Sequence, residues 1–523
     1  MAVFITSAAY VDGDLEAEFG KIPPCFLPIG NRPLLYWQAE LVRAEFPDSR
    51  LTLSLPKSVE IPPQIEEILS KFRVDVVRVA DGCTLKESLL RTLISSWGVE
   101  EPLTVLHGDT LVGPLPKNSD FVGVARPKFS YRWDRTSDQQ NGADSAVWCG
   151  VFGFADPKLL MQSLSSESDF RNGVLAYSSG RELQEVEVKD WLDLGHLNSY
   201  LDARKHFSTQ RSFNRLSFSS FAVEKSSSDL EKMQAEANWF LALPPELKPY
   251  TPAIYAAEND SYSIELLPFL PLNDVFVHGN QDERYWLSIY NQYGEWFAAS
   301  GDFASATGRE SVRRAEQERE KLIVRKSRQR LDELKRSNHF KTDSPIVLNG
   351  KTFRSIEDVA EDCIRIALSQ PLLPGVTHGD PCFSNTLVDT RGGRLRFIDP
   401  RGARNCDIDS LYGDRVYDVA KIAHSAIGQY DVIVSGAYKI EYSGGSDFGF
   451  ELLTGPSQQR AGHLLLERGI SGLPLKAVEQ SLPTMVLLFL SMLPLHSDDR
   501  ERQLALLLNG LRLYDEFVKD KFQ

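Results

Sequence analysis

The sequence predicts an α/β protein with two domains, the first of which is built on a mostly parallel β-sheet. The chain has 523 residues, which is too long for a single hydrophobic core. Residues 1 to about 205 alternate short β-rich runs with amphipathic stretches, whereas the pattern from residue 353 onward is largely helical. A change of pattern near residue 207 therefore divides the chain into expected domains of residues 1–207 and 208–523.

The expected helices and strands follow from these patterns. In the first domain, strands are expected over residues 2–6, 51–55, 74–80, 103–109, 120–125 and 146–154, and a helix over 34–46. In the second domain, strands are expected over 218–225 and 261–270, and a helix over 230–241. Opposite charges at helical spacing between residues 304 and 338 indicate a solvated helix or helical hairpin, with a phosphate- or polymer-binding face as the alternative.

Composition and charge exclude several classes of protein. The net charge of −14 argues against a general nucleic-acid binder, which needs an excess of Lys and Arg. Six scattered cysteines without CxxC spacing predict reduced thiols rather than a zinc site or a disulfide scaffold. The amino-terminal residues lack the basic region of a signal peptide, and the longest apolar run, residues 484–493, is too short to span a bilayer. We therefore expect a cytoplasmic protein without membrane insertion, and the sequence gives no prediction of oligomeric state.

The segment HGDPCFSN, followed by LRFIDPRG, carries the strongest functional signal of the second domain. It places Asp380 before Asn385, and Asp399 follows at the end of a strand-like run. Phosphoryl transfer needs such a set, because one carboxylate orients the attacking hydroxyl while an amide and a second carboxylate hold Mg²⁺ against the nucleotide phosphates. A chance occurrence of these residues at helix caps and turns is the alternative interpretation.

This pair of motifs resembles the aminoglycoside phosphotransferase and choline kinase family, which implies a bilobal protein-kinase-like fold for residues 208–523. The resemblance implies that Asp380 is the catalytic base and that Asn385 and Asp399 ligate Mg²⁺. It also implies that His378 braces the catalytic loop. Asp418 resembles the helix aspartate that supports this loop, with a simple surface carboxylate as the alternative.

The same resemblance requires a nucleotide site for ATP upstream of the motifs. Lys225, at the end of FAVEK, is expected to grip the nucleotide phosphates, and Glu236 in a predicted helix is expected to orient it. The backbone near Leu266 and Leu267 resembles the interlobe hinge that binds adenine. No Gly-rich loop precedes Lys225, so the segment RLSFSSF is expected to serve as the nucleotide lid.

Three segments of the first domain resemble the sugar-phosphate and phosphocholine nucleotidyltransferases, which implies a Rossmann-like fold. They are FGKIPPCFLPIGNRPLLYWQAELV, the strand LTVLHGDTLV that leads into Asp109, and KDWLDLGHLNSYLDAR, where Trp191, Asp193 and Gly195 match the signature of the family. In this chemistry a substrate phosphate attacks the α-phosphate of a nucleoside triphosphate and expels pyrophosphate. The resemblance implies that Asp109 and Asp193 hold the Mg²⁺ that the reaction requires.

Further residues of the first domain are candidates for binding the second nucleotide, with CTP or GTP favoured. The position of the activating lysine of the family carries Pro24, and Lys21 is expected to substitute for it. Gly82 lies in a segment that resembles the loop that reads the nucleobase. Arg126 and Lys128 are candidates for binding phosphates, with a plain surface loop as the alternative for Lys128.

Together these motifs predict a bifunctional enzyme that acts on a small-molecule substrate. The second domain would phosphorylate a hydroxyl of a sugar, alditol or amino alcohol, and the first would convert the product to a nucleoside-diphosphate derivative. By resemblance, such precursors feed the synthesis of capsule or lipopolysaccharide. The alternative, favoured by Pro24 and the acidic loop before it, is an active kinase with a non-catalytic nucleotide-binding regulatory domain. A third hypothesis makes both halves structural, with the charged helix recruiting a partner.

Overall fold

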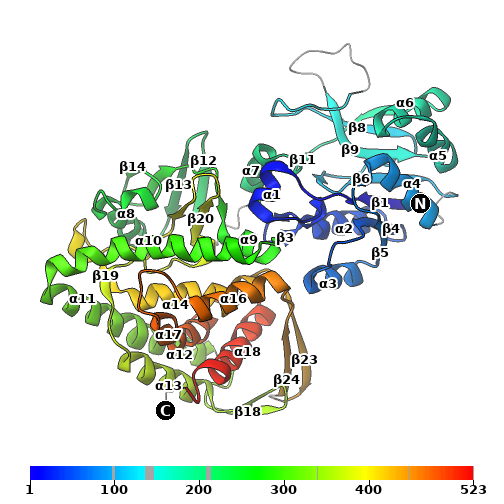
Figure 1. Cartoon of the computed structure of the whole chain (residues 1–523). Coiled ribbons are helices and arrows are strands. Elements are labelled where there is room, and N and C mark those ends of the chain that lie inside the picture. The colour runs from blue at the N-terminus through cyan, green and yellow to red at the C-terminus, as the bar shows by residue number, and fades with distance from the viewer. Residues whose placement is uncertain (97–99, 136–145, 208–213, 338–339, 446, 522–523) are drawn as a thin grey trace. The chain divides into compact units, whose positions relative to one another are not determined.

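The computed structural model describes two compact units of the chain (Figure 1). It covers residues 1–523 apart from 97–99, 136–145, 208–213, 338–339, 446 and 522–523. The first unit comprises Met1–Thr209 with His278–Asn280, and the second comprises Gln210–Val277 with Gln281–Gln523.

A seven-stranded sheet forms the centre of the first unit, and its order is β10-β8-β9-β6-β1-β4-β5. Strand β9 is antiparallel to its neighbours β6 and β8, while the other neighbouring pairs are parallel, which confirms the mostly parallel sheet. The strands are β1 (Ala2–Thr6), β4 (Arg50–Pro56), β5 (Val74–Val79), β6 (Leu103–His107), β8 (Phe121–Ala125), β9 (Val147–Phe154) and β10 (Gln184–Glu187).

Helices that connect these strands bury their apolar faces against the sheet. Phe4, Val105 and Phe152 of the sheet share one core with Leu89 of α4 and Tyr177 of α6. The helices are α1 (Gly13–Phe19), α2 (Leu34–Glu45), α3 (Pro63–Lys71), α4 (Leu85–Ser95), α5 (Pro157–Ser166), α6 (Phe170–Gly180) and α7 (Leu197–His206). Short strands complete the unit: β2 (Pro28–Ile29), β3 (Arg32–Pro33), β7 (Thr110–Leu111) and β11 (Leu192–Asp193).

The strand order places a topological switch point between β1 and β6. From β1 the chain continues outward through β4 and β5, and then returns to the other side of β1 with β6. Ligands of open α/β sheets bind at such a point, beyond the carboxyl ends of the strands. The loops after β1 and β6 meet there, because the Gly108 N–H donates to the Thr6 carbonyl at 2.8 Å.

The second unit begins with a small antiparallel sheet in the order β12-β13-β15-β14, together with helix α8 (Leu230–Ala242). Its strands are β12 (Asn214–Phe218), β13 (Ala222–Ser227), β14 (Ile254–Ala257) and β15 (Ser261–Glu265). Helix α8 begins where the Asp229 carboxylate accepts the backbone N–H of Lys232, the usual role of an N-cap side chain. Buried Trp239 and Phe240 join this helix to the core of the unit.

Helices dominate the rest of the second unit. They are α9 (Leu272–His278), α10 (Glu283–Thr307), α11 (Arg309–Arg319), α12 (Lys326–Ser337), α13 (Ile356–Ser369), α14 (Arg415–Ala426), α15 (Tyr430–Val434), α16 (Pro456–Arg468), α17 (Ala477–Ser491) and α18 (Arg500–Phe517). Helix α17 contains most of the longest apolar run and packs against α14, α13 and α18. In the described part of the chain, no helix has both the length and the apolar character needed to cross a membrane.

Short strand pairs interrupt these helices. Strands β16 (Leu270–Pro271), β20 (Thr386–Asp389) and β21 (Arg394–Phe397) form one small sheet, and β19 (Pro374–Val376) pairs with β22 (Tyr412–Asp414). A further sheet joins β17 (Ile346–Leu348), β18 (Lys351–Phe353), β23 (Tyr438–Gly444) and β24 (Asp447–Leu452). The β23–β24 hairpin departs from the largely helical pattern expected after residue 353. The alternation of Tyr438, Ile440 and Tyr442 is the signal that could have predicted it.

The charged stretch between residues 304 and 338 is only partly a solvated surface. It contains the end of α10, helix α11, a π-helical segment over Glu320–Arg325, and α12 up to Ser337. Arg313 and Lys335 form exposed ion pairs, whereas the Arg319 side chain is 7% exposed and lies 2.6 Å from the Asp414 carboxylate. Arg319 also donates to the Gln370 and Pro371 carbonyls, and so fixes the start of α14 to the preceding chain.

We predict that Arg319→Ala destabilises the second unit by about 3–5 kcal/mol, because it leaves the Asp414 carboxylate buried without its cation. Arg313→Ala is the matched control, since Arg313 pairs with Glu310 on the surface and should contribute about 0–1 kcal/mol. Urea unfolding followed by circular dichroism measures both. Equal effects of the two substitutions would contradict this account of α14.

Candidate functional sites

A buried lysine of the second unit lies between two carboxylates. Lys225 of β13 is 4% exposed, and its Nζ lies 2.6 Å from Glu236 Oε2 of α8 and 3.2 Å from Asp399 Oδ1. The Tyr262 hydroxyl donates to the same Glu236 oxygen at 2.8 Å. Burial alone would lower the pKa of Lys225, but the charges of Asp399 and Glu236 raise it, so the ammonium stays protonated. Lys225 is thus a fixed cation beside the exposed face of Asp399.

The segment after β19 forms a tight loop around His378. The Asp380 N–H donates to His378 Nδ1 at 3.2 Å, and the Asn385 side-chain amide donates to the Asp380 carbonyl at 3.0 Å. The rings of Trp239 and Phe397 enclose the imidazole, with centroids 5.1 and 5.7 Å away. Burial lowers the pKa of His378 to about 4, so the ring is neutral at pH 7 and Nδ1 can accept this hydrogen bond.

Asp418 of α14 fixes the backbone of this loop by hydrogen bonds. Its two carboxylate oxygens accept the backbone N–H groups of His378 at 2.8 Å and Gly379 at 2.7 Å. Asp418 is fully buried, and burial raises its pKa to about 7. A surface role for Asp418 is therefore wrong, because its side chain is a structural acceptor for the loop that carries Asp380.

Asp380 faces two cations. Its Oδ1 lies 2.9 Å from Lys421 Nζ, and the Arg401 guanidinium donates to the Gly379 carbonyl at 3.1 Å and to the Tyr417 hydroxyl at 2.7 Å. Burial alone would raise the pKa of Asp380, but Lys421 and Arg401 hold it well below its usual range. Asp380 is therefore ionised, and it is suited to orienting a hydroxyl more than to removing a proton from it early.

The β20–β21 hairpin and the residue after it bring Asp399 back to the loop. Ile398 donates its N–H to the Asn385 carbonyl at 3.0 Å, which joins the two motifs. Asp399 follows with φ of 53°, a left-handed conformation that turns its side chain toward Lys225. A Cβ at Gly379, whose φ is 81°, would come within 2.6 Å of the Arg401 Cβ. The loop can therefore approach Arg401 this closely only with glycine at this position.

The predicted hinge and nucleotide lid occupy defined positions in the small sheet. The Leu266 N–H donates to the Phe221 carbonyl at 2.8 Å, so adenine binding here would use the Leu266 carbonyl and the backbone of Leu267. The segment RLSFSSF forms most of β12 and the turn into β13, where Ser219 N–H donates to the Ala222 carbonyl. A hairpin turn thus stands where the sequence lacks a Gly-rich loop.

In the first unit, Asp109 and Asp193 converge at the switch point. Asp193 on β11 is opposite Thr110 on β7, and the Leu194 N–H donates to the Asp109 carbonyl at 2.8 Å. A Cβ at Gly195 would lie 2.5 Å from Asp109 Oδ2 and 3.4 Å from Asp193 Oδ1, so glycine leaves room for both carboxylates. Burial raises the pKa of Asp109, which a bound cation would offset.

Aromatic side chains pack together on one side of this carboxylate pair. His196 Nδ1 lies 2.8 Å from Asp193 Oδ2, and its ring stacks on Tyr131 with centroids 4.0 Å apart. Trp133 packs against both His196 and Trp191 at centroid distances of 5.0 and 5.3 Å. The hydrogen bond to Asp193 raises the pKa of His196. These rings fill one side of the carboxylate pair by packing on one another.

The remaining candidates of the first unit are less closely gathered. Lys21 is exposed, with its Nζ 4.3 Å from the centroid of Tyr10, and Pro24 begins a 3-10 turn. Gly82 has φ of 77° and open space around it, next to Asp81, which accepts the Ser58 N–H at 3.1 Å. Lys128 forms an ion pair with Asp202 at 2.8 Å, and Arg126 is exposed.

Comparison with known proteins identifies the second unit. Residues 208–451 match the model of the Phosphotransferase enzyme family, and no curated protein is significantly similar to the chain. This part of the chain is a phosphotransferase domain with a kinase-like fold, and the protein is therefore an enzyme.

Solved structures resemble the amino-terminal part of the chain at low similarity. A nucleoside-diphosphate-sugar pyrophosphorylase from Vibrio cholerae RC9 has a TM-score of 0.34 and 11% identity, covering 39% of this chain and 100% of its own. A Bacillus anthracis protein assigned as a glucose-1-phosphate thymidylyltransferase has a TM-score of 0.32 and 13% sequence identity. The match covers 40% of this chain and 96% of that protein. A UDP-glucose pyrophosphorylase has a TM-score of 0.30 and 14% sequence identity. The match covers 40% of this chain and 100% of that protein.

Several site residues were not predicted from the sequence. Arg401 lies two residues after Asp399, and Lys421 lies three residues after Asp418 on the same helix. These short spacings from predicted residues were the available signal. The sequence around His196 carried no such signal, since His196 only follows a glycine after a short strand.

We predict that His378 makes the second unit less stable as the pH falls from about 6.5 to about 4. The imidazole binds a proton near pH 6.5 in the unfolded state but only near pH 4 in the folded state. Protonation in this window therefore lowers the free energy of unfolding by up to about 3 kcal/mol. His378→Asn removes the titration and keeps a side-chain acceptor for the Asp380 N–H. In thermal unfolding between pH 4.5 and 7, the wild type should have a higher melting temperature than the variant, and this difference should decrease toward low pH. A difference in melting temperature that does not change with pH would contradict the buried neutral imidazole.

Proposed function

We propose that the second unit transfers the γ-phosphoryl group of ATP to a hydroxyl of a small metabolite. The observation that carries this proposal is the convergence of Asp380, Asn385 and Asp399 with the buried Lys225–Glu236 pair. A lysine fixed by a helix glutamate can hold nucleotide phosphates, and an ionised aspartate nearby can orient the acceptor. The match of residues 208–451 to a phosphotransferase family supports the same reaction class.

The residues suit a magnesium-dependent reaction. The Asn385 amide oxygen and the Asp399 carboxylate are the oxygen donors that Mg²⁺ prefers, and the Asp399 side chain is 46% exposed, so it is accessible to a metal. In the described residues, no cluster of three or more His, Cys, Asp or Glu side chains could hold a metal ion on its own. This agrees with Mg²⁺ bound by one or two protein groups together with nucleotide phosphates.

Each protein group then has one task. Lys225 holds the phosphates, and Glu236 with Tyr262 keeps the lysine side chain in place. Asn385 and Asp399 would hold Mg²⁺, which neutralises charge on the phosphoryl oxygens when bound. Asp380 orients the acceptor hydroxyl, whose oxygen forms the new bond to phosphorus as the bond to ADP breaks. The hydroxyl proton passes to Asp380 late in the transfer.

Asp380→Ala is expected to lower the rate of ATP-dependent phosphorylation by about 10²–10⁴-fold, since the acceptor hydroxyl loses its orienting base. The rate of ADP formation with an accepted metabolite measures this effect. Asp389→Ala, which removes a carboxylate from the β20–β21 turn, is the matched control and should keep the wild-type rate. A variant without Asp380 that retains the wild-type rate would exclude this role.

We further propose that the first unit transfers a nucleotidyl group from CTP or GTP to the phosphorylated product and releases pyrophosphate. The juxtaposition of Asp109 and Asp193 at the switch point supports this reaction, because two carboxylates there can hold Mg²⁺ beside an α-phosphate. The product of the second unit carries the phosphate that this step needs as nucleophile. Such an activated precursor would serve capsule or lipopolysaccharide synthesis in the cytoplasm.

A non-catalytic nucleotide-binding role for the first unit is the second candidate. It is favoured by the position of Lys21, which is exposed and lies over the Tyr10 ring, while Pro24 occupies the place of the lysine in the resembling family. Helix α1 adds Asp14 and Glu16 to its first turn, which disfavours a bound triphosphate.

Asp109→Asn separates the two candidates. If the first unit is a nucleotidyltransferase, the variant should release pyrophosphate from CTP or GTP at least about 10²-fold more slowly than wild type. It should keep the phosphorylation activity of the second unit, which serves as an internal control. Pyrophosphate release is measured with a phosphorylated-metabolite panel. A wild-type protein that binds the nucleotide and releases no pyrophosphate would support the regulatory role.

A further inference from the structure

Basic side chains gather beside Asp380, the aspartate that we propose orients the acceptor hydroxyl. Lys421 pairs with Asp380 at 2.9 Å, and Arg401 is held beside it by its hydrogen bonds to Gly379 and Tyr417. The Arg401 guanidinium also lies 4.7 Å from the centroid of the Tyr417 ring, which fixes its plane. Lys326 adds a third basic side chain, which lines the same small pocket as Tyr417, the hydrogen-bond partner of Arg401.

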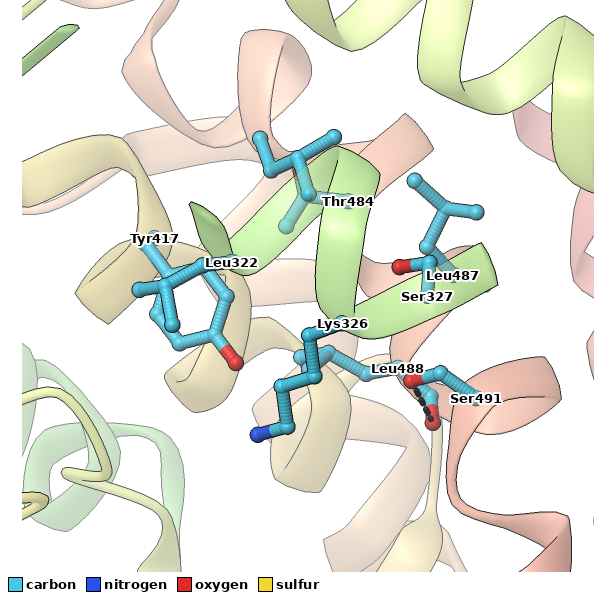
Figure 2. Close-up of a pocket in the computed structure, with 9 residues that line it drawn as sticks. Leu322, Lys326, Ser327, Tyr417, Thr484, Leu487, Leu488 and Ser491 are labelled. Atoms are coloured by element: carbon cyan, nitrogen blue, oxygen red, sulfur yellow. Dashed lines mark hydrogen bonds between the residues drawn. The ribbon is translucent and has the colours of Figure 1, made fainter. Parts of the chain in front are cut away.

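Lys326 lines a small pocket next to a π-helical segment. It begins α12 directly after the π-helical segment Glu320–Arg325, and such segments occur often at functional sites. Its side chain lines a small pocket together with Tyr417, and Figure 2 shows the Lys326 nitrogen and the Tyr417 hydroxyl at the same end of this pocket. Within the described part of the chain, Lys326 has no hydrogen-bonded or ion-paired partner.

These basic side chains could pair with an anion of the acceptor. Arg401, burial and Lys421 together lower the pKa of Lys326 to about 6, so its amine is largely uncharged near pH 7 when no anion is bound. A bound carboxylate or phosphate would favour the protonated amine and could accept hydrogen bonds from lysine and arginine donors.

The three basic side chains lie apart from the lysine that we propose binds the nucleotide. Lys225 interacts with Glu236 and Asp399, whereas Lys326 interacts with Arg401, Lys421, Asp380 and Arg330. The pocket that Lys326 lines is formed by the π-helical segment and by α12, α14 and α17, without residues of the small sheet that carries Lys225. These basic side chains are thus separate from the lysine that we propose holds the nucleotide phosphates.

We propose that Lys326, Arg401 and Lys421 form a subsite for an anionic group of the acceptor. The metabolite that is phosphorylated is then a hydroxy acid or a hydroxyl compound that already carries a phosphate. This inference rests on the proposed kinase function of the second unit and narrows its substrate class. Amino alcohols and amino sugars are disfavoured, since their ammonium groups would be repelled by Arg401 and Lys421.

Binding of small anions to the nucleotide-loaded enzyme tests the subsite. The full chain is saturated with Mg²⁺ and the non-hydrolysable ATP analogue AMP-PNP, and inorganic phosphate or lactate is titrated by calorimetry in a buffer of low chloride. We expect at least one of them to bind, and Lys326→Gln to weaken this binding about tenfold. Lys326→Arg should retain it. Lys321→Gln, which removes an exposed cation paired with Glu318 from the same segment, should have no effect.

The outcomes separate the subsite from the kinase function. Preference for lactate identifies a hydroxy acid, and preference for phosphate identifies a phosphorylated acceptor. If neither anion binds the loaded wild type, or if Lys326→Gln binds as tightly as wild type, the subsite is excluded. If Lys326→Gln loses AMP-PNP affinity instead, the cations serve the nucleotide, which also excludes the subsite. Failure of the wild type to bind AMP-PNP would count against the proposed kinase function itself.

Discussion

The buried carboxylate of Asp418 is the contact on which the second unit's site depends. It accepts the backbone N–H groups of both His378 and Gly379, and so fixes the loop from which Asp380 projects. Helix α14, which carries Asp418, is itself anchored at its start by the buried Arg319–Asp414 ion pair. Lys421 comes from the same helix and reaches Asp380. One helix therefore determines both the position and the charge of the Asp380 carboxylate.

The charges of this site fall into two networks with different tasks. Lys225, Glu236 and Asp399 form one, whose buried lysine is suited to nucleotide phosphates. Asp380, Lys421, Arg401 and Lys326 form the other, in which Lys421 pairs with Asp380 and Arg401 donates to the neighbouring Gly379 carbonyl. This division explains how one site could bind both ATP and an anionic acceptor in separate positions. Lys225 would contact the nucleotide phosphates, and the basic side chains near Asp380 would contact the acceptor.

The sequence predicted the fold class, because β-rich runs mark six of the longer strands of the first unit and an amphipathic pattern marks helix α2. It also named residues that the structure brings together over long separations, such as Lys225 with Asp399 and Asp109 with Asp193. It missed Lys326, since a single lysine in a charged stretch has no distinguishing pattern and its position depends on a π-helical segment. The solvated interpretation of that stretch failed at Arg319, whose burial is set by tertiary packing.

Mass analysis of a metabolite panel incubated with the full chain, ATP and Mg²⁺ tests the central claim most directly. The account predicts that a compound with both a hydroxyl and an anionic group gains one phosphoryl group while ATP becomes ADP. Added CTP or GTP should then convert that product to a nucleoside-diphosphate derivative with release of pyrophosphate. A protein that binds ATP but phosphorylates no compound of the panel would contradict the account.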